Sequence, residues 1–200
     1  MNETYIHPTA DVSDKAIVGA GTKVWHQAQV RENAVIGPDC IIGKGVYVDH
    51  DVVIGSNVKI QNNVSLYNGV TLADDVFIGP HVTFTNDLYP RSFDPEWHVL
   101  PTLVGRGASI GANATIICGV TIGAFAMIGA GAVIAADVPD HGLVYGNPAR
   151  LRGFACQCGR PVTYESRKHD TVVLLCQSCG ERLEVSRELY ELSTRPEHIP

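Results

Sequence analysis

The sequence is poor in charged and aromatic residues. Charged residues make up 18% of its 200 positions and aromatic residues 7%, whereas an average soluble chain is roughly 25% charged. The formal net charge is −6, so the chain lacks the basic surplus with which proteins neutralise phosphate backbones. Nucleic acid is therefore excluded as the main partner, and an anionic small ligand would need local basic groups.

The first residues of the sequence include neither a basic stretch nor an apolar segment after it, so we expect no secretion signal. We expect a cytosolic protein, in which six cysteines favour free thiols or a metal site over disulfides. Residues 116–136 are apolar and long enough to span a bilayer. However, their four glycines weaken a helix and their isoleucines recur every six residues. We therefore expect no membrane segment.

A six-residue period organises most of the chain. Aliphatic or aromatic residues keep this spacing twice, at Ile6, Val12, Val18, Val24, Val30, Ile36, Ile42, Val48, Ile54, Ile60, Leu66, Leu72, Ile78 and Phe84, and again at Val104, Ile110, Ile116, Ile122, Ile128 and Ile134. Three residues after many of them stands Gly, Asn or Asp, as at Gly21, Asn33, Asp39, Gly45, Asn57, Asn63, Gly69 and Gly107. These residue types tolerate the left-handed backbone of a tight corner. The pattern predicts short strands joined by corners and stacked around a central apolar column.

This repeat resembles that of the hexapeptide-repeat acyltransferases, from residue 6 to about residue 153. The resemblance implies an all-β fold, a left-handed parallel β-helix with three hexads per coil. It also implies a homotrimer with active sites between subunits. We expect this domain over residues 1–153 and a small cysteine-rich module over residues 154–200.

Residues 85–103 interrupt the repeat and are expected to form a functional loop, although a decorative insertion is the alternative. With eighteen residues per coil, side chains eighteen apart should lie one above another. Two polar columns then lead to the loop, Asp14, Glu32, His50, Asn68 and Asn86 in one, and Ser13, Arg31, Asp49, Tyr67 and Thr85 in the other. These columns suit a polar, anionic ligand, but they are equally expected at a solvated corner.

Three segments sharpen the resemblance: residues 60–72, 84–92 and 117–123. They are similar to bacterial acetyltransferases that modify a 3-amino group on a nucleotide-linked sugar. That group includes enzymes for UDP-2-acetamido-3-amino-2,3-dideoxyglucuronate, the substrate we expect, in surface (lipopolysaccharide) biosynthesis. Enzymes for dTDP-3-amino-3,6-dideoxyhexoses share nearly the same loop, and an O-acetyltransferase of the same fold is a further alternative.

The loop holds the expected catalytic residues. Many hexapeptide-repeat acetyltransferases carry a histidine before proline here, but residues 86–90 read Asn-Asp-Leu-Tyr-Pro. The resemblance implies that Asn86 orients the amine through its carbonyl oxygen, so the proton goes to water or to the departing thiolate. Asp87 is the second candidate, as a base or as the partner of a protonated amine. His50 and His81 are expected to be ordinary corner residues.

Polar residues near the loop are candidates for holding the nucleotide sugar. Chemistry and position select Arg31, Gln61, Asn62, Tyr67 and Arg91. The planar fork of an arginine suits a phosphate or a uronate carboxylate. An ion pair with Asp94 or Glu96 is the alternative for Arg91.

Acetyl-CoA is the expected co-substrate, bound along the second run of hexads. The resemblance implies that small residues face its pantetheine arm, namely Ala114, Ala132, Ala135 and Ala136. Alternatively, these small residues merely fit a tapering coil. Residues 146–150, GNPAR, resemble the family's closing segment. There Arg150, and after it Arg152, would meet the coenzyme phosphates.

The C-terminal module contains two cysteine pairs, Cys156 with Cys158 and Cys176 with Cys179, each followed by glycine. This spacing predicts a four-thiolate zinc ribbon with a structural Zn2+, because four thiolates leave no open position. Two disulfides, or a module that has lost its metal, are the alternatives. Residues 161–165 and 171–175 are predicted strands, and residues 186–192 a short helix.

Two functions of other classes compete with the acetyltransferase. A hydratase of the carbonic-anhydrase type needs clustered histidines around a catalytic metal, but His26, His50 and His81 fall in different corner columns. A non-catalytic scaffold would use the coil for assembly alone. The alanines of the second run and the GNPAR segment argue against that scaffold.

Overall fold

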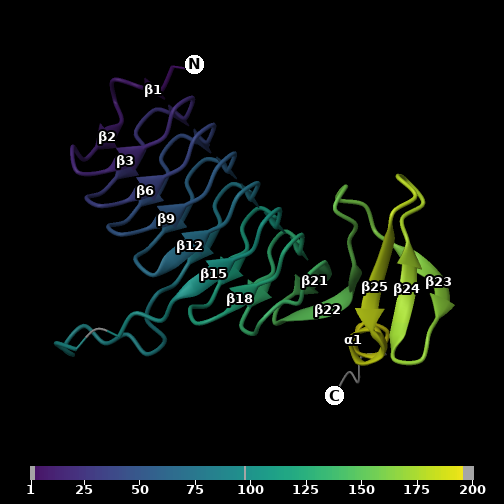
Figure 1. The fold of residues 1–200 in the computed structure, drawn as a ribbon. Coiled ribbons are helices and arrows are strands. Elements are labelled where there is room, and N and C mark those ends of the chain that lie inside the picture. The colour runs from purple at the N-terminus through teal and green to yellow at the C-terminus, as the bar shows by residue number, and fades with distance from the viewer. Residues whose placement is uncertain (1–2, 97, 196–200) are drawn as a thin grey trace.

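The computed structural model describes residues 3–96 and 98–195, and short parallel strands stack there in three faces (Figure 1). The first face contains β1 (Tyr5–Ile6), β4 (Lys23–Val24), β7 (Ile41–Ile42), β10 (Lys59–Ile60), β13 (Phe77–Ile78), β16 (Ser109–Ile110), β19 (Met127–Ile128), β21 (Gly142–Gly146) and β22 (Ala149–Phe154). The second contains β2 (Asp11–Val12), β5 (Gln29–Val30), β8 (Tyr47–Val48), β11 (Ser65–Leu66), β14 (Thr83–Phe84), β17 (Thr115–Ile116) and β20 (Val133–Ile134). The third contains β3 (Ile17–Val18), β6 (Val35–Ile36), β9 (Val53–Ile54), β12 (Val70–Leu72), β15 (Thr102–Val104) and β18 (Thr121–Ile122).

The strand register confirms the eighteen-residue coil. Lys23 pairs with Ile41, and Ile41 pairs with Lys59, so equivalent hexad positions lie directly above one another. Side chains alternate along each short strand, and the second strand residue points inward. Ile42, Ile60 and their equivalents are consequently buried in one continuous apolar column. The fold is therefore the parallel β-helix that the sequence period predicted.

The corners also form as predicted. Their left-handed residues have φ between 55° and 94°, and they include Gly21, Asn33, Asp39, Gly45, Asn57, Asn63, Gly69 and Gly107. A second glycine position serves close packing between coils, because a Cβ at Gly37 would lie 2.6 Å from the carbonyl oxygen of Gly55. These corners fix where polar side chains leave the coil.

One coil is longer than the others. After β14 the chain leaves the stack, projects outward and returns at β15 (Figure 1). The stack continues without a change of register, because Thr71 of β12 pairs with Leu103. The loop ends earlier than the expected residue 103, since Thr102 is fully buried and already pairs with Val70. The hydrophobic pattern did not indicate that β15 begins at Thr102, because Thr102 is polar although its side chain points inward.

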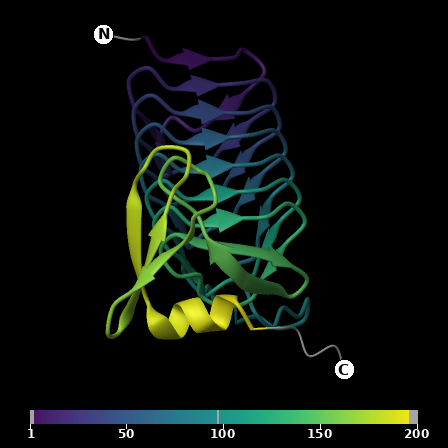
Figure 2. The same ribbon diagram turned by 90° about the vertical axis from the view of Figure 1, so that its right-hand side faces the viewer.

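The C-terminal module follows β22, which pairs antiparallel with β21. It consists of an antiparallel sheet of β23 (Thr163–Arg167), β24 (Thr171–Leu175) and β25 (Arg182–Ser186), followed by α1 (Arg187–Ser193). The Ser186 side chain caps α1 by accepting a hydrogen bond from Leu189 N at 3.2 Å. The module has its own apolar core, and Leu151 packs against both cores. It lies beside the last coils, with α1 at their end (Figure 2). Within the described ranges, no helix is long and apolar enough to cross a membrane.

Candidate functional site

A cavity of about 530 Å³ opens where the loop leaves the stack. Tyr67 and Thr85 follow strands of the second face and line one side of it. Asn86, Asp87 and Arg91 line the loop side. We call this space the acceptor cavity. It brings together four of the residues that the sequence singled out.

Asn86 anchors the loop and faces the acceptor cavity. Its backbone oxygen accepts a hydrogen bond from Leu100 N at 3.0 Å, which closes the two ends of the loop. Its side-chain Nδ2 is buried and has no hydrogen-bond partner among the described residues. A buried amide left unsatisfied costs about 1–3 kcal/mol. A bound ligand that pairs with this amide would recover that free energy.

The loop side of the acceptor cavity is acidic. Asp87, Asp94 and Glu96 all line it, beside Arg91 as the one basic lining residue. Asp87 Oδ1 accepts a hydrogen bond from Tyr89 N at 2.9 Å, which holds the carboxylate in place. Across the described residues, Arg91 forms no ion pair with Asp94 or Glu96, and its guanidinium donates to the carbonyl oxygen of Pro90 at 2.9 Å. The excess of carboxylates favours a cationic group, such as an amine, in this cavity.

A buried carboxylate supports the corner one coil before the cavity. The Asp49 carboxylate accepts hydrogen bonds from the Tyr47 hydroxyl at 3.0 Å, from His50 N at 2.8 Å and from Asn68 N at 3.2 Å. It also forms an ion pair with Arg31, with 3.0 Å between Asp49 Oδ1 and Arg31 Nη1. Burial by itself raises the pKa of Asp49. The hydrogen bonds outweigh burial and hold the pKa below its ordinary value. Asp49 therefore stays ionised, a structural role that its place in the polar column did not reveal.

Replacing Asp49 with alanine is expected to lower the free energy of unfolding by about 2 kcal/mol at pH 7, because three donors and Arg31 lose their acceptor. The native pKa is depressed, so this contribution is complete above the unfolded-state pKa of about 3.9 and disappears as the pH falls through the native pKa. Urea unfolding at pH 7 and at about pH 3 measures it, with exposed Asp14→Ala as the control. An equal loss at both pH values would contradict this prediction.

The structure separates some predicted acceptor residues from this cavity. Gln61 and Asn62 lie one corner earlier and line a different cavity of about 300 Å³. Arg31 pairs with Glu32 at 2.6 Å as well as with Asp49, so two carboxylates already oppose its charge. Within one chain, only Tyr67 and Arg91 of the predicted sugar ligands line the acceptor cavity.

Two of the alanines predicted to bind the coenzyme point into the coil. Ala114 and Ala132 are buried in the apolar column. Each immediately precedes a strand whose first residue points outward, so alternation turns the alanine inward. Their small side chains fit the interior of the coil, as the alternative given for them in the sequence holds.

Three other predicted coenzyme residues do lie together. Ala135, Ala136 and Arg150 line a cavity of about 250 Å³ at the end of the stack, which we call the end cavity. Leu189 and Leu192 of α1 line it too. These leucines were not among the predicted coenzyme residues, because they belong to a separate module. Their apolar spacing in a short predicted helix was the available signal.

His50 and His81 both lie at corners of the stack. His50 Nδ1 lies 2.8 Å from Asp51 and 3.2 Å from the Asn68 amide nitrogen. His81 occupies a left-handed corner with φ of 60°, and its backbone N–H donates to the Asn62 carbonyl oxygen. Neither lines the acceptor cavity.

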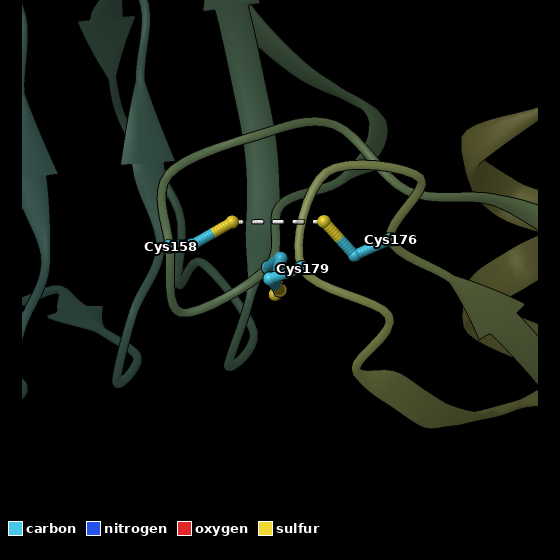
Figure 3. Close-up of side chains that lie close together, drawn as sticks. Cys158, Cys176 and Cys179 are labelled. Atoms are coloured by element: carbon cyan, nitrogen blue, oxygen red, sulfur yellow. Dashed lines mark hydrogen bonds between the residues drawn. The ribbon is translucent and has the colours of Figure 1, made fainter.

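Four cysteines of the module converge from two tight turns, and Figure 3 shows three of them, Cys158, Cys176 and Cys179. Their sulfur atoms all lie within 4.8 Å of one another, with separations of 3.5 Å for Cys156–Cys179 and 3.6 Å for Cys158–Cys176. All four are free thiols, since a disulfide needs about 2.05 Å. Tetrahedral zinc with Zn–S bonds of about 2.3 Å places its sulfurs about 3.8 Å apart. The cluster therefore has the size of a zinc site.

The surroundings of the cluster shift the pKa values of its thiols in opposite directions. Backbone N–H groups of Cys179 and Ser178 point to Cys176 and lower its pKa to about 7. The backbone N–H of Glu181 acts in the same sense on Cys179, but the crowding of the other sulfurs prevails and raises the pKa of Cys179 to about 12. Four thiols this close cannot all ionise without a cation. The donor set fits a soft divalent metal.

The residues of the stack are similar to known proteins. The family described as bacterial transferase hexapeptide (six repeats) matches residues 15–50, 33–67, 51–86 and 101–136, more than half of the chain. A dTDP-3-amino-3,6-dideoxy-α-D-galactopyranose 3-N-acetyltransferase from Aneurinibacillus thermoaerophilus is 41% identical over 81 residues, which cover 40% of this chain and 39% of that protein. Serine acetyltransferase 4 from Arabidopsis thaliana is 36% identical over 62 residues, covering 31% of this chain and 18% of that protein.

A solved structure is also similar. It is a perosamine N-acetyltransferase mutant from Caulobacter crescentus in complex with CoA and GDP-perosamine, with a TM-score of 0.50 and 28% identity. The match covers 76% of this chain and 57% of that one. The chain thus matches less than two thirds of the length of these relatives.

Proposed function

Since the chain belongs to the bacterial transferase hexapeptide family, we propose that it transfers acetyl from acetyl-CoA to the 3-amino group of a nucleotide-linked amino sugar. The acceptor cavity is the observation that carries this proposal. It combines the unpaired amide of Asn86 with an acidic lining that suits an amine. The Aneurinibacillus relative is a 3-N-acetyltransferase of a dTDP-linked amino sugar, and the Caulobacter enzyme is an N-acetyltransferase in complex with GDP-perosamine, so both support an amine on a nucleotide-linked sugar as the acceptor.

The reaction needs a neutral amine held against the thioester carbon. In the structure the unpaired Asn86 atom is the donor Nδ2. In the proposed complex a half-turn of the side-chain amide puts its oxygen in that place, where the oxygen accepts an N–H of the amine and aims the nitrogen lone pair. The N–C bond forms, the C–S bond breaks, and the amine proton passes to water or to the departing thiolate. Asp87 faces the same space and attracts the protonated amine before it loses its proton.

The identity of the sugar is the finer part of the proposal. The loop sequence favours UDP-2-acetamido-3-amino-2,3-dideoxyglucuronate, used for bacterial surface polysaccharides. The Aneurinibacillus relative supports a dTDP-3-amino-3,6-dideoxyhexose equally well, and the serine acetyltransferase relative keeps an O-acetyltransferase as the alternative.

A thiol-release assay tests the proposal. The purified protein is mixed with acetyl-CoA and with matched 3-amino and 3-hydroxy sugars linked to UDP, dTDP or GDP. We expect thiol release with at least one amino sugar and none with its hydroxy counterpart. Release with the hydroxy sugar alone would replace the N-acetyltransferase with an O-acetyltransferase, and no release with any acceptor would overturn the proposal.

The third face supports a homotrimer. Ile17, Val53 and Leu103 point outward from it and are 62%, 43% and 48% exposed. They stand in one file with Val35, which Thr71 interrupts between Val53 and Leu103. Exposed apolar residues of this kind favour burial against copies of the same chain. The acceptor cavity opens at the corner beside this face, so a neighbouring copy would complete it.

Replacing Leu103 with glutamate is therefore expected to shift the protein from trimer to monomer, because a buried unpaired charge is strongly destabilising. Light scattering of the eluting protein measures the mass. Phe77→Glu, at an exposed apolar position of the first face, is the matched control and should leave a trimer. A monomeric parent protein would contradict the trimer.

We further propose that the four cysteines hold one structural zinc ion. Cys156, Cys158, Cys176 and Cys179 would supply all four ligands, so the metal would have no open coordination position and no catalytic chemistry. Its contribution would be to fold the module. The free thiols agree with a cytosolic location, where thiols stay reduced.

A further inference from the structure

The end cavity lies on the same corner of the stack as the acceptor cavity. Thr83 of β14 pairs with Thr115 of β17, which pairs with Val133 of β20. The residues that follow these strands therefore form one vertical file, from Asn86 through Cys118 to Ala136. Two coil spacings separate its ends, about 10 Å. An extended molecule can follow this corner from one cavity to the other.

The repeat supplies only one wall of the end cavity. Ala135 and Ala136 follow β20, and Arg150 belongs to β22. The opposite side consists of Leu189 and Leu192 from α1. Leu189 also packs in the core of the C-terminal module, whereas Leu192 is 47% exposed. The module thus presents an exposed apolar side chain to a cavity that the stack leaves open.

The chemistry of the end cavity matches a flat, largely apolar group that carries phosphate. Alanine, leucine, valine and proline side chains make up most of the lining. Arg150 is exposed at its edge and donates to the neighbouring carbonyl of Ala149, which leaves other donors of its guanidinium to meet an anion. An adenosine with phosphates combines these properties.

We propose that α1 forms one wall of the site for the adenosine end of acetyl-CoA, with Leu192 in contact with the nucleoside and Arg150 on its phosphates. The proposal rests on the acetyl-CoA dependence proposed above. It gives the cysteine-rich module a direct part in binding the coenzyme. Because the metal-sized cluster joins the two turns that frame this module, metal binding and coenzyme affinity are coupled through α1.

The test compares Leu192→Ser with Glu188→Ser, an exposed residue of α1 outside the end cavity. Calorimetry measures the dissociation constants of acetyl-CoA and of adenosine 3′,5′-bisphosphate, which lacks the pantetheine arm. We expect Leu192→Ser to weaken both ligands about tenfold, the effect of losing one apolar side-chain contact. Glu188→Ser should change neither constant more than about twofold.

The outcomes separate this inference from the proposed function. If the parent protein binds both ligands and Leu192→Ser binds them equally well or more tightly, α1 does not form a wall of the adenosine site. The proposed acetyltransferase function would be unaffected by that result. Weaker binding of acetyl-CoA with unchanged binding of the bisphosphate would also overturn it, because Leu192 would then contact another part of the coenzyme. A parent protein that binds neither ligand would remove the proposed function as well.

Discussion

Replacing Asn86 with alanine is expected to lower kcat/KM for the amino-sugar acceptor about 100-fold, the effect of a nucleophile that is no longer aimed at the thioester. The affinity for acetyl-CoA should stay within about twofold of the parent value, because Asn86 acts on the acceptor. The pH profile should keep its shape, rising as the amine loses its proton, since Asn86 does not titrate. Steady-state kinetics over pH, together with calorimetry, measure these quantities.

Asn68 provides the matched control because it is the same residue one coil earlier in the same column. Its amide bonds to the His50 carbonyl oxygen at 3.0 Å and does not line the acceptor cavity. Asn68→Ala should therefore keep kcat/KM near the parent value. Asp87→Asn keeps a hydrogen-bond acceptor for Tyr89 N. If the rise of kcat/KM with pH disappeared in Asp87→Asn, the rise would report Asp87 and not the amine, and Asp87 would be the base that takes the amine proton.

Substituting both exposed cluster cysteines, Cys158→Ser and Cys179→Ser, is expected to abolish metal binding. We expect one zinc per chain in the parent protein and less than about 0.1 in the double variant. Structural zinc contributes about 10–16 kcal/mol in small metal-dependent domains, so the module should unfold while the stack stays folded. Elemental analysis and limited proteolysis measure both effects, with cleavage expected within residues 154–195.

Cys118→Ser is the control, because this cysteine lies in the stack and outside the cluster. It should retain zinc and resist cleavage. A reduced parent protein that contains no zinc and takes up none on refolding would contradict the metal site. If α1 walls the end cavity, the double variant should also lose affinity for adenosine 3′,5′-bisphosphate.

The stack could be predicted from the sequence because each hexad contains the same two features at the same positions. An inward aliphatic residue, such as Ile60, and a corner residue that accepts positive φ, such as Asn63, recur at fixed spacing. Each coil therefore repeats its neighbour's packing. The loop was visible as a gap in that period, and only its end was misplaced. Thr102 is polar but inward, so hydrophobicity alone concealed it.

The site was harder to predict than the stack. The eighteen-residue period shows which residues lie above one another, but it shows less directly on which face or corner of the coil a residue lies. Gln61 stands six residues before Tyr67, one hexad earlier, which places it on another corner. Ala114 is small and precedes an outward strand residue, so strand alternation, more than its size, shows that it points inward. The leucines of α1 reach the end cavity only through docking of the module on the stack. No local pattern encodes that contact.

The projecting loop leaves the β-helix after β14 and rejoins it at β15, and the strands on either side of it keep their register. Its length and composition are consequently independent of the interior packing, which fixes the regular coils at eighteen residues and the last one, from Met127 to Leu143, at sixteen. A graft between relatives, exchanging residues 85–101 alone, should change acceptor preference while the thermal stability of the ladder stays nearly constant. Recognition of the sugar can thus diversify on a framework that itself has little freedom to change.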